Sequence, residues 1–131
     1  MFSFMNSTSD VTTISNDSPR VFRQRSPGVE MCVLRAHPDG ALTFLIRMQK
    51  GARAERHGHP GGEEAYLLSG KLHIDRRVDA AGKPLPDAVA AVGEYFFAPP
   101  GEVHEGHVEE DTTFLVVAPG GIVSTKGSSP K

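Results

Sequence analysis

Residues 51–70 read GARAERHGHPGGEEAYLLSG, and this stretch places two histidines and a glutamate close together in the chain. One residue separates His57 from His59, so their side chains point to the same face of an extended chain. The run PGG at 60–62 forms a flexible turn, which brings Glu63 back towards the same face. Two imidazoles and one carboxylate can therefore meet at one point, as part of a metal site.

A second stretch, PPGEVH at residues 99–104, supplies His104 after a tight turn. Three imidazole nitrogens and one carboxylate suit a borderline divalent metal: iron, manganese, nickel, copper or zinc. Such a donor set leaves room for a further ligand on a six-coordinate ion. An open coordination position is typical of catalytic metal sites, whereas structural sites have all positions filled by the protein.

Short apolar segments and turns fill the chain around these two stretches. We expect strands at 29–36, 41–49, 65–69, 71–75, 95–98 and 112–118. Within 41–49, one face carries Leu42, Phe44, Ile46 and Met48, which is the period of a strand. The 14 glycines and 10 prolines suit many turns, and no long segment has helical periodicity. The sequence therefore predicts an all-β sandwich or barrel.

The composition predicts one domain at residues 20–123 between two polar ends. Residues 1–19 are rich in Ser, Thr and Asn and are expected to be a flexible arm, with one short strand near 11–14. Residues 124–131 are expected to be a flexible tail.

The charge and the cysteine count exclude several classes of function. The net charge is −2 without a basic run, so nucleic acid is not an expected partner. No apolar stretch approaches the roughly 20 residues that cross a bilayer, and no secretory signal is visible, so we expect a cytoplasmic protein without membrane contact. Cys32 is the single cysteine, which excludes an internal disulfide and a cysteine-rich zinc site. Its apolar surroundings predict that it is buried.

The two stretches resemble the paired motifs of the cupin family. The first motif, G-x5-H-x-H-x3-E-x6-G, matches at every fixed position from Gly51 to Gly70. The second, G-x5-P-x-G-x2-H-x3-N, matches from Gly93 through His104. Val108 stands where the second motif ends in Asn. That Asn is not a metal ligand in the family, so its loss leaves the predicted site intact.

The resemblance, over residues 40–118, implies a cupin double-stranded β-helix, or jelly-roll barrel. It assigns one divalent metal ion to four ligands: His57, His59, Glu63 and His104. Fe(II) is the favoured ion, with Zn, Mn and Ni as alternatives. We also predict a catalytic role for Glu63 as a proton acceptor. The resemblance further implies a homodimer that forms through its sheets.

Three functions follow from the resemblance. The motif region is similar to small single-domain cupins related to diketone and hydroxyketone dioxygenases, which implies an Fe(II)-dependent oxidoreductase acting on a small oxygen-chelating substrate. It is also similar to the zinc-binding cupin domain of some anti-sigma factors, which implies a non-catalytic metal-dependent binding or sensing domain. Sugar-nucleotide isomerases and epimerases generally lack the full metal set, so four intact ligands argue against that class.

Three other polar residues are predicted to lie away from the metal. Glu64 neighbours Glu63, and strand parity sends it to the opposite face. His107 follows His104 by three residues, which again predicts the opposite face. His73 stands between two apolar residues and is expected to face solvent.

Overall fold

The computed structural model describes residue 13, residues 20–120 and residues 123–124. The predicted strand near 11–14 and most of the two predicted flexible ends lie outside these residues. No part of the described chain forms a helix with the length and apolar character needed to span a bilayer. The strands of the described residues are β1 (Arg23–Ser26), β2 (Val29–Ala36), β3 (Leu42–Met48), β4 (Arg53–Gly58), β5 (Glu63–Ser69), β6 (Lys71–Val78), β7 (Ala88–Ala91), β8 (Tyr95–Ala98), β9 (Val103–His107), β10 (Thr112–Ala118) and β11 (Val123–Ser124).

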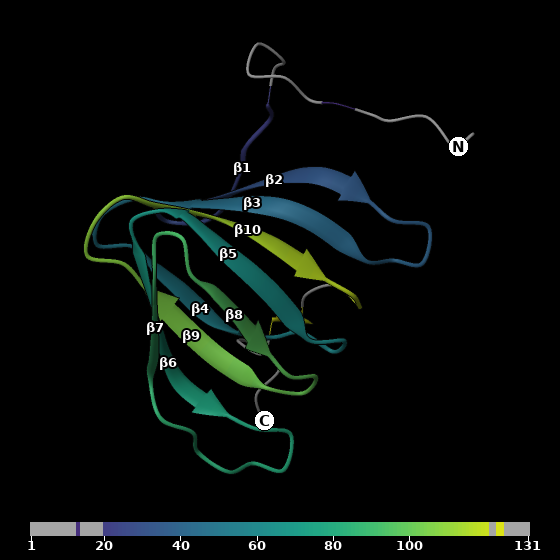
Figure 1. The fold of residues 1–131 in the computed structure, drawn as a ribbon, viewed down its shortest axis with the longest axis vertical. Coiled ribbons are helices and arrows are strands. Elements are labelled where there is room, and N and C mark those ends of the chain that lie inside the picture. The colour runs from purple at the N-terminus through teal and green to yellow at the C-terminus, as the bar shows by residue number, and fades with distance from the viewer. Residues whose placement is uncertain (1–12, 14–19, 121–122, 125–131) are drawn as a thin grey trace.

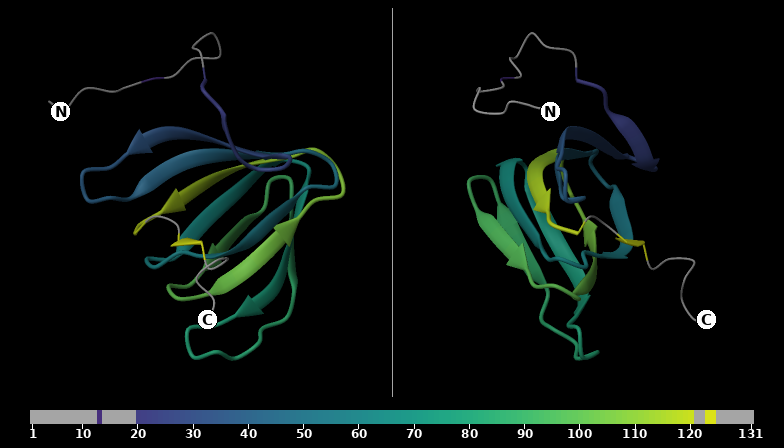
Figure 2. Two further views of the ribbon diagram at one scale, coloured as in Figure 1. Left: turned by 180° about the vertical axis from the view of Figure 1, so that it is seen from behind. Right: turned by 90° about the vertical axis from the view of Figure 1, so that its right-hand side faces the viewer.

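The strands form two antiparallel sheets that face each other (Figures 1 and 2). A six-stranded sheet has the order β1-β2-β3-β10-β5-β8, and a five-stranded sheet has the order β11-β4-β9-β6-β7. Strands that are distant in sequence are neighbours in both sheets, as in a jelly roll. The predicted all-β jelly-roll fold is confirmed.

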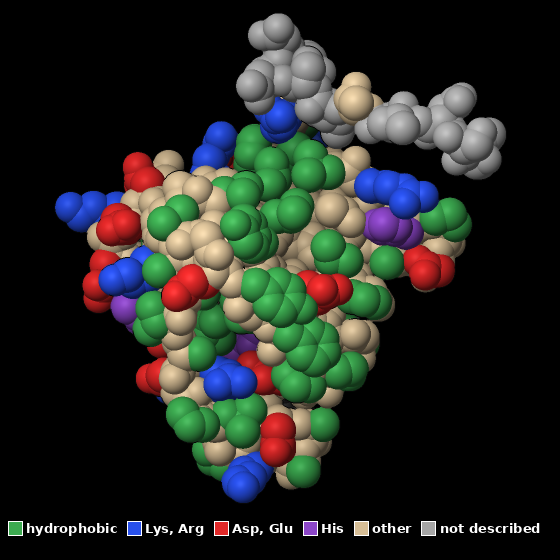
Figure 3. Space-filling view, viewed as in Figure 1, with side chains coloured by type: hydrophobic (Ala, Val, Ile, Leu, Met, Phe, Trp, Pro, Cys, Tyr) green, Lys and Arg blue, Asp and Glu red, His purple; other side chains and the backbone are tan. Residues whose placement is uncertain are grey.

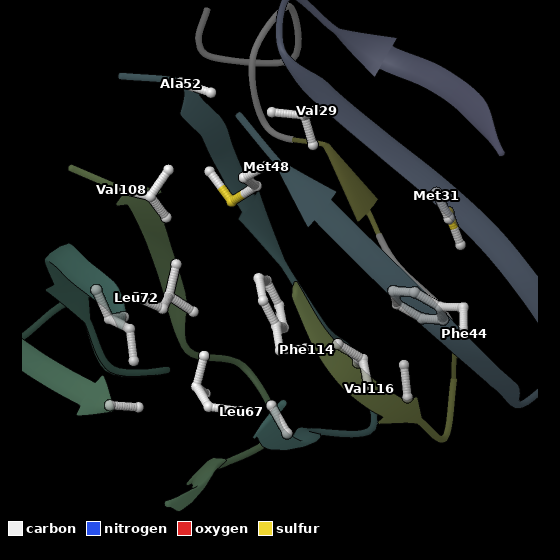
Figure 4. Packing of buried hydrophobic residues seen from close by; sticks show 14 residues of the cluster. Val29, Met31, Phe44, Met48, Ala52, Leu67, Leu72, Val108, Phe114 and Val116 are labelled. Atoms are coloured by element: carbon white, nitrogen blue, oxygen red, sulfur yellow. The ribbon is translucent and has the colours of Figure 1, made fainter. Parts of the chain in front are cut away.

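The core lies between the two sheets because each strand alternates inward and outward side chains. In β10, Phe114 and Val116 are buried, and Leu115 between them is less so. Phe44 and Met48 of β3 point into the same space, as the alternation predicted (Figure 4). Full burial of one such side chain stabilises the fold by about 1.5–3 kcal/mol. Cys32 is buried, also as predicted.

Several strands could not be recognised in the sequence. The predicted bounds of β2, β8 and β10 agree with the structure, and those of β3 differ by one residue at each end. β7, β9 and β11 were not predicted as strands, and neither were β1 and β4, whose sequences RQRS and RAERHG show no apolar alternation. Both are held by main-chain pairing with β2 and β9. β4 matters most, since it carries the first predicted metal ligand.

Gly70 is the point where the chain passes from β5 in one sheet to β6 in the other. Its φ is +77°, a conformation that favours glycine. A Cβ atom here would lie 2.3 Å from Thr112 Oγ1 and 2.4 Å from the carbonyl oxygen of Asp111. The fixed glycine that ends the first motif is therefore required both by its backbone angle and by the close approach of β10.

Candidate metal centre

The four predicted ligands come from both sheets and meet between them. His57 near the end of β4 is the direct cross-strand partner of His104 on β9, in the five-stranded sheet. His59 follows β4, and Glu63 begins β5 in the six-stranded sheet. One donor atom from each of the four side chains lies within 4.8 Å of the others. The structure thus brings together all four residues that the motifs singled out.

The three imidazole rings surround a common point at different angles. The ring centroids of His57 and His104 are 4.7 Å apart with an interplanar angle of 87°. Those of His57 and His59 are 5.1 Å apart at 85°, and those of His59 and His104 are 5.9 Å apart at 47°. Rings that stand nearly perpendicular can direct their nitrogens from separate directions to one ion.

Several polar atoms of this cluster are buried without a hydrogen bond. Both ring nitrogens of His59 and the Oε1 atom of Glu63 have no hydrogen-bond partner. His59 Nε2 lies 3.0 Å from Glu63 Oε1, so the two atoms are close but not aligned for a hydrogen bond. Burying polar atoms in this way is costly unless another partner satisfies them. Donor atoms that converge without bonding one another fit a metal ion.

Local hydrogen bonds fix which nitrogen of two rings is available. His57 Nδ1 lies 2.7 Å from the carbonyl oxygen of Glu55, which can only accept, so the ring proton is on Nδ1. His104 Nδ1 lies 2.9 Å from Glu102 Oε2, and this contact likewise directs Nδ1 of the ring to an acceptor oxygen. The Nε2 atoms of both rings are thereby left to bind a metal ion.

The residue that sequence reasoning missed is Glu102. Its buried carboxylate accepts hydrogen bonds from Arg77 Nε at 2.9 Å and Arg77 Nη2 at 3.1 Å, and it also contacts His104. The sequence held a signal for it, because Glu102 and His104 have the same i, i+2 spacing as the first histidine pair. Arg77 is 25 residues away in the chain and carried no such signal.

The charges of the cluster are set by its burial and by its neighbours. Desolvation, aided by the nearby His104, lowers the pKa of His57 to about 4, so this ring is neutral at physiological pH. Burial alone raises the pKa of Glu63, but His104 and His59 outweigh it and hold that pKa at about 2. Desolvation lowers the pKa of His104, but the carboxylates of Glu63 and Glu102 outweigh it and raise the pKa above its usual value. The carboxylate of Glu63 is therefore ionised, as a metal ligand must be.

The cluster borders a cavity of about 260 Å³ inside the jelly roll. Apolar residues that line it include Met31, Phe44, Phe96 and Phe114. Figure 4 shows Met31, Phe44 and Phe114 among the packed side chains between the sheets. An ion held by the four donors would thus face a space large enough for a small molecule. The donor set of three nitrogens and one carboxylate oxygen fits a borderline divalent ion.

The residues predicted to lie elsewhere do so. Glu64 is exposed on the outer face of β5, where its carboxylate accepts a hydrogen bond from Tyr95 at 3.0 Å. His107 is on the outer face of β9, away from His104. His73 is half-buried rather than fully exposed, because its ring stacks on that of His107.

Comparison with known proteins identifies the family. The sequence model of the ChrR cupin-like domain matches residues 10–123. The DNA damage-repair/toleration protein DRT102 of Arabidopsis thaliana is 30% identical over 90 residues, which are 69% of this chain and 26% of that protein. The chain thus spans about a quarter of the length of this curated relative.

Solved structures show the same fold at low identity. An RmlC-like cupin from Shewanella frigidimarina NCIMB 400 has a TM-score of 0.67 and 20% identity, over 85% of this chain and 93% of that one. Oxalate decarboxylase from Bacillus subtilis has a TM-score of 0.67 and 24% identity, over 87% of this chain and 31% of that one. KdgF from a Halomonas species has a TM-score of 0.58 and 18% identity, over 76% and 86%. By its sequence and its fold, the chain belongs to the ChrR cupin-like domain family of the cupin superfamily.

Proposed function

We propose that this cupin is an Fe(II)-dependent dioxygenase acting on a small molecule that chelates through two oxygens. His57, His59, Glu63 and His104 are the proposed ligands of the iron. The observation that supports this function is the four-donor cluster, with three of its four residues buried, at the wall of a largely apolar cavity. An iron ion in this position would supply Lewis-acid activation of a chelating substrate and redox chemistry with O2.

The side chains of the chain have separate roles in this proposal. The three rings and the carboxylate would hold a divalent ion with one negative charge, and the remaining positive charge would attract an enolate-like substrate. Apolar walls exclude water and receive the apolar part of the substrate. The low pKa of Glu63 favours the role of ligand, and its service as a proton acceptor stays a prediction.

A second candidate function is metal-dependent binding or sensing without catalysis. Among the described residues, the buried polar side chains are His59, Glu63, Glu102, His104 and Thr112. All but Thr112 are proposed ligands or contact one. This part of the chain thus holds no separate buried acid or base, a feature that suits a binding site. Zinc would occupy the same donors without redox chemistry.

Oxygen uptake by protein loaded with different metals distinguishes the two functions. The purified full chain is analysed for metal, stripped with a chelator and reloaded with Fe(II) or Zn(II). We expect the iron form to consume O2 with a suitable diketone, hydroxyketone or catechol, and the zinc form to bind the compound without consuming O2. His57→Ala should abolish uptake, while Glu64→Gln, one residue from a ligand but on the outer face, should retain it. Inert iron protein across all three classes of compound, with tight ligand binding by the zinc form, would favour the sensor.

We also propose that the chain forms a homodimer through the outer face of the six-stranded sheet. Large apolar side chains of this face are 45 to 56% exposed: Tyr66, Leu68, Tyr95 and Phe97. Figure 3 shows hydrophobic side chains gathered over one face of the molecule. Exposed apolar patches of this kind are typical of protein–protein contacts.

A further inference from the structure

A second group of possible metal ligands lies on the outer face of the five-stranded sheet. His73 on β6 and His107 on β9 are direct cross-strand partners. Glu109 follows β9, and one donor atom from each of these three side chains lies within 4.8 Å of the others. Strand parity places this group opposite the interior cluster, and the two groups share no side chain.

The ring of His107 is oriented by a carboxylate. His107 Nδ1 is hydrogen bonded to Asp75 Oδ2, and Asp75 lies two residues beyond His73 on the same face of β6. This arrangement leaves Nε2 of His107 as the free donor atom. A carboxylate behind the distal nitrogen is the usual second partner of a metal-binding histidine.

The ring of His73 has a buried nitrogen without a hydrogen bond. His73 Nε2 is inaccessible to solvent and has no hydrogen-bond partner. It lies 3.7 Å from Glu109 Oε1, which is too long for a hydrogen bond. The side chain of Glu109 is 76% exposed, so it is free to move towards the rings. The group therefore offers two nitrogen donors on rigid strands and one adaptable carboxylate.

We propose that His73, His107 and Glu109 bind a second divalent ion, with Asp75 positioning His107. Two imidazoles and a carboxylate select zinc, copper, nickel or cobalt rather than magnesium or calcium. The rings stack with centroids 4.5 Å apart and 12° between their planes, so the lone pairs of their nitrogens lie in nearly parallel planes. Rotation about the broad χ2 torsion of one ring makes them converge on an ion. Water would complete the coordination on the side of Glu109, whose side chain is 76% exposed.

Zinc titration of the metal-stripped full chain tests this proposal by calorimetry near neutral pH. We expect two classes of site in the wild type, one for each cluster. His107→Ala should remove the outer class and retain the interior one. Glu109→Gln changes an exposed side chain and should weaken the outer class by about tenfold without affecting the fold. Asp75→Asn should weaken it by about 10- to 100-fold through the loss of the orienting carboxylate.

Two control variants test whether the outer class of zinc site belongs to this group of residues. His37→Ala removes a histidine of the β2–β3 turn, which contacts Thr43, and should leave both classes unchanged. His57→Ala should remove the interior class and retain the outer one. The loss of zinc binding at one site can therefore be measured while the other site still binds zinc. The proposal is overturned if the His107→Ala and Glu109→Gln proteins both bind zinc with wild-type stoichiometry and affinity.

Discussion

Replacing Glu102 with Gln tests whether this buried carboxylate positions a metal ligand. The carboxylate accepts two hydrogen bonds from Arg77 and contacts His104 Nδ1, and all three distances are 2.9–3.1 Å. The Gln side chain keeps the shape but turns one oxygen into an NH2 group, which faces an N–H donor. At least one charge-assisted hydrogen bond is lost, and each contributes about 1.5–3 kcal/mol.

We therefore expect Glu102→Gln to weaken metal binding by about 10- to 100-fold, which is the range for partners of metal ligands. This corresponds to about 1.4–2.8 kcal/mol. The dissociation constant is measured by competition with a chelator of known zinc affinity, after circular dichroism has verified the fold. Glu30→Gln is the matched control, since Glu30 accepts two hydrogen bonds from Arg47 on the outer surface but touches no histidine. Zinc affinities of the Glu102→Gln protein and the wild type within twofold of each other would refute the positioning role.

Three further predictions concern the metal and the assembly. His104→Ala should empty the interior site in metal analysis, because none of the described neighbours is placed to supply its nitrogen, whereas Glu64→Gln should leave occupancy unchanged. The raised pKa of His104 means that a proton competes with the metal, so zinc affinity should rise with pH above 6.5 until this pKa is passed. His57, with a pKa of about 4, adds no competition in that range, and a flat zinc titration from pH 6 to 8 would contradict this account. Phe97→Asp should convert the proposed dimer to a monomer in light scattering, and a wild-type mass of one chain would reject the dimer itself.

The grouping of the four candidate metal ligands was more predictable from the sequence than the sheets around them. The spacing of His57, His59 and Glu63 is local, and two residues of equal parity on an extended chain share a face whatever the rest of the fold does. The strands β2 and β10 were also visible, because their apolar residues alternate or run together. The spacing of the second motif then predicted that His104 belongs to the same site as these three residues, although it lies 41 positions after Glu63 in the chain.

The parts that escaped prediction depend on contacts between distant residues. β1 has no apolar pattern and exists as a strand because it pairs with β2. Arg77 joins the site only through Glu102, across a separation that no local pattern encodes. The stacking of His73 on His107 likewise follows from the register of β6 and β9, which the sequence does not reveal.

The division of the proposed ligands between the two sheets would make an interior ion a cross-link between them. Glu63 belongs to one layer and His57 and His104 to the other, so parting the layers removes the single carboxylate ligand. Free metal at 100 times the dissociation constant stabilises the folded state by about 2.7 kcal/mol. That free energy opposes opening of the jelly roll at this edge, so amide protons of β5 and β9 should exchange together, and more slowly, once the ion is bound.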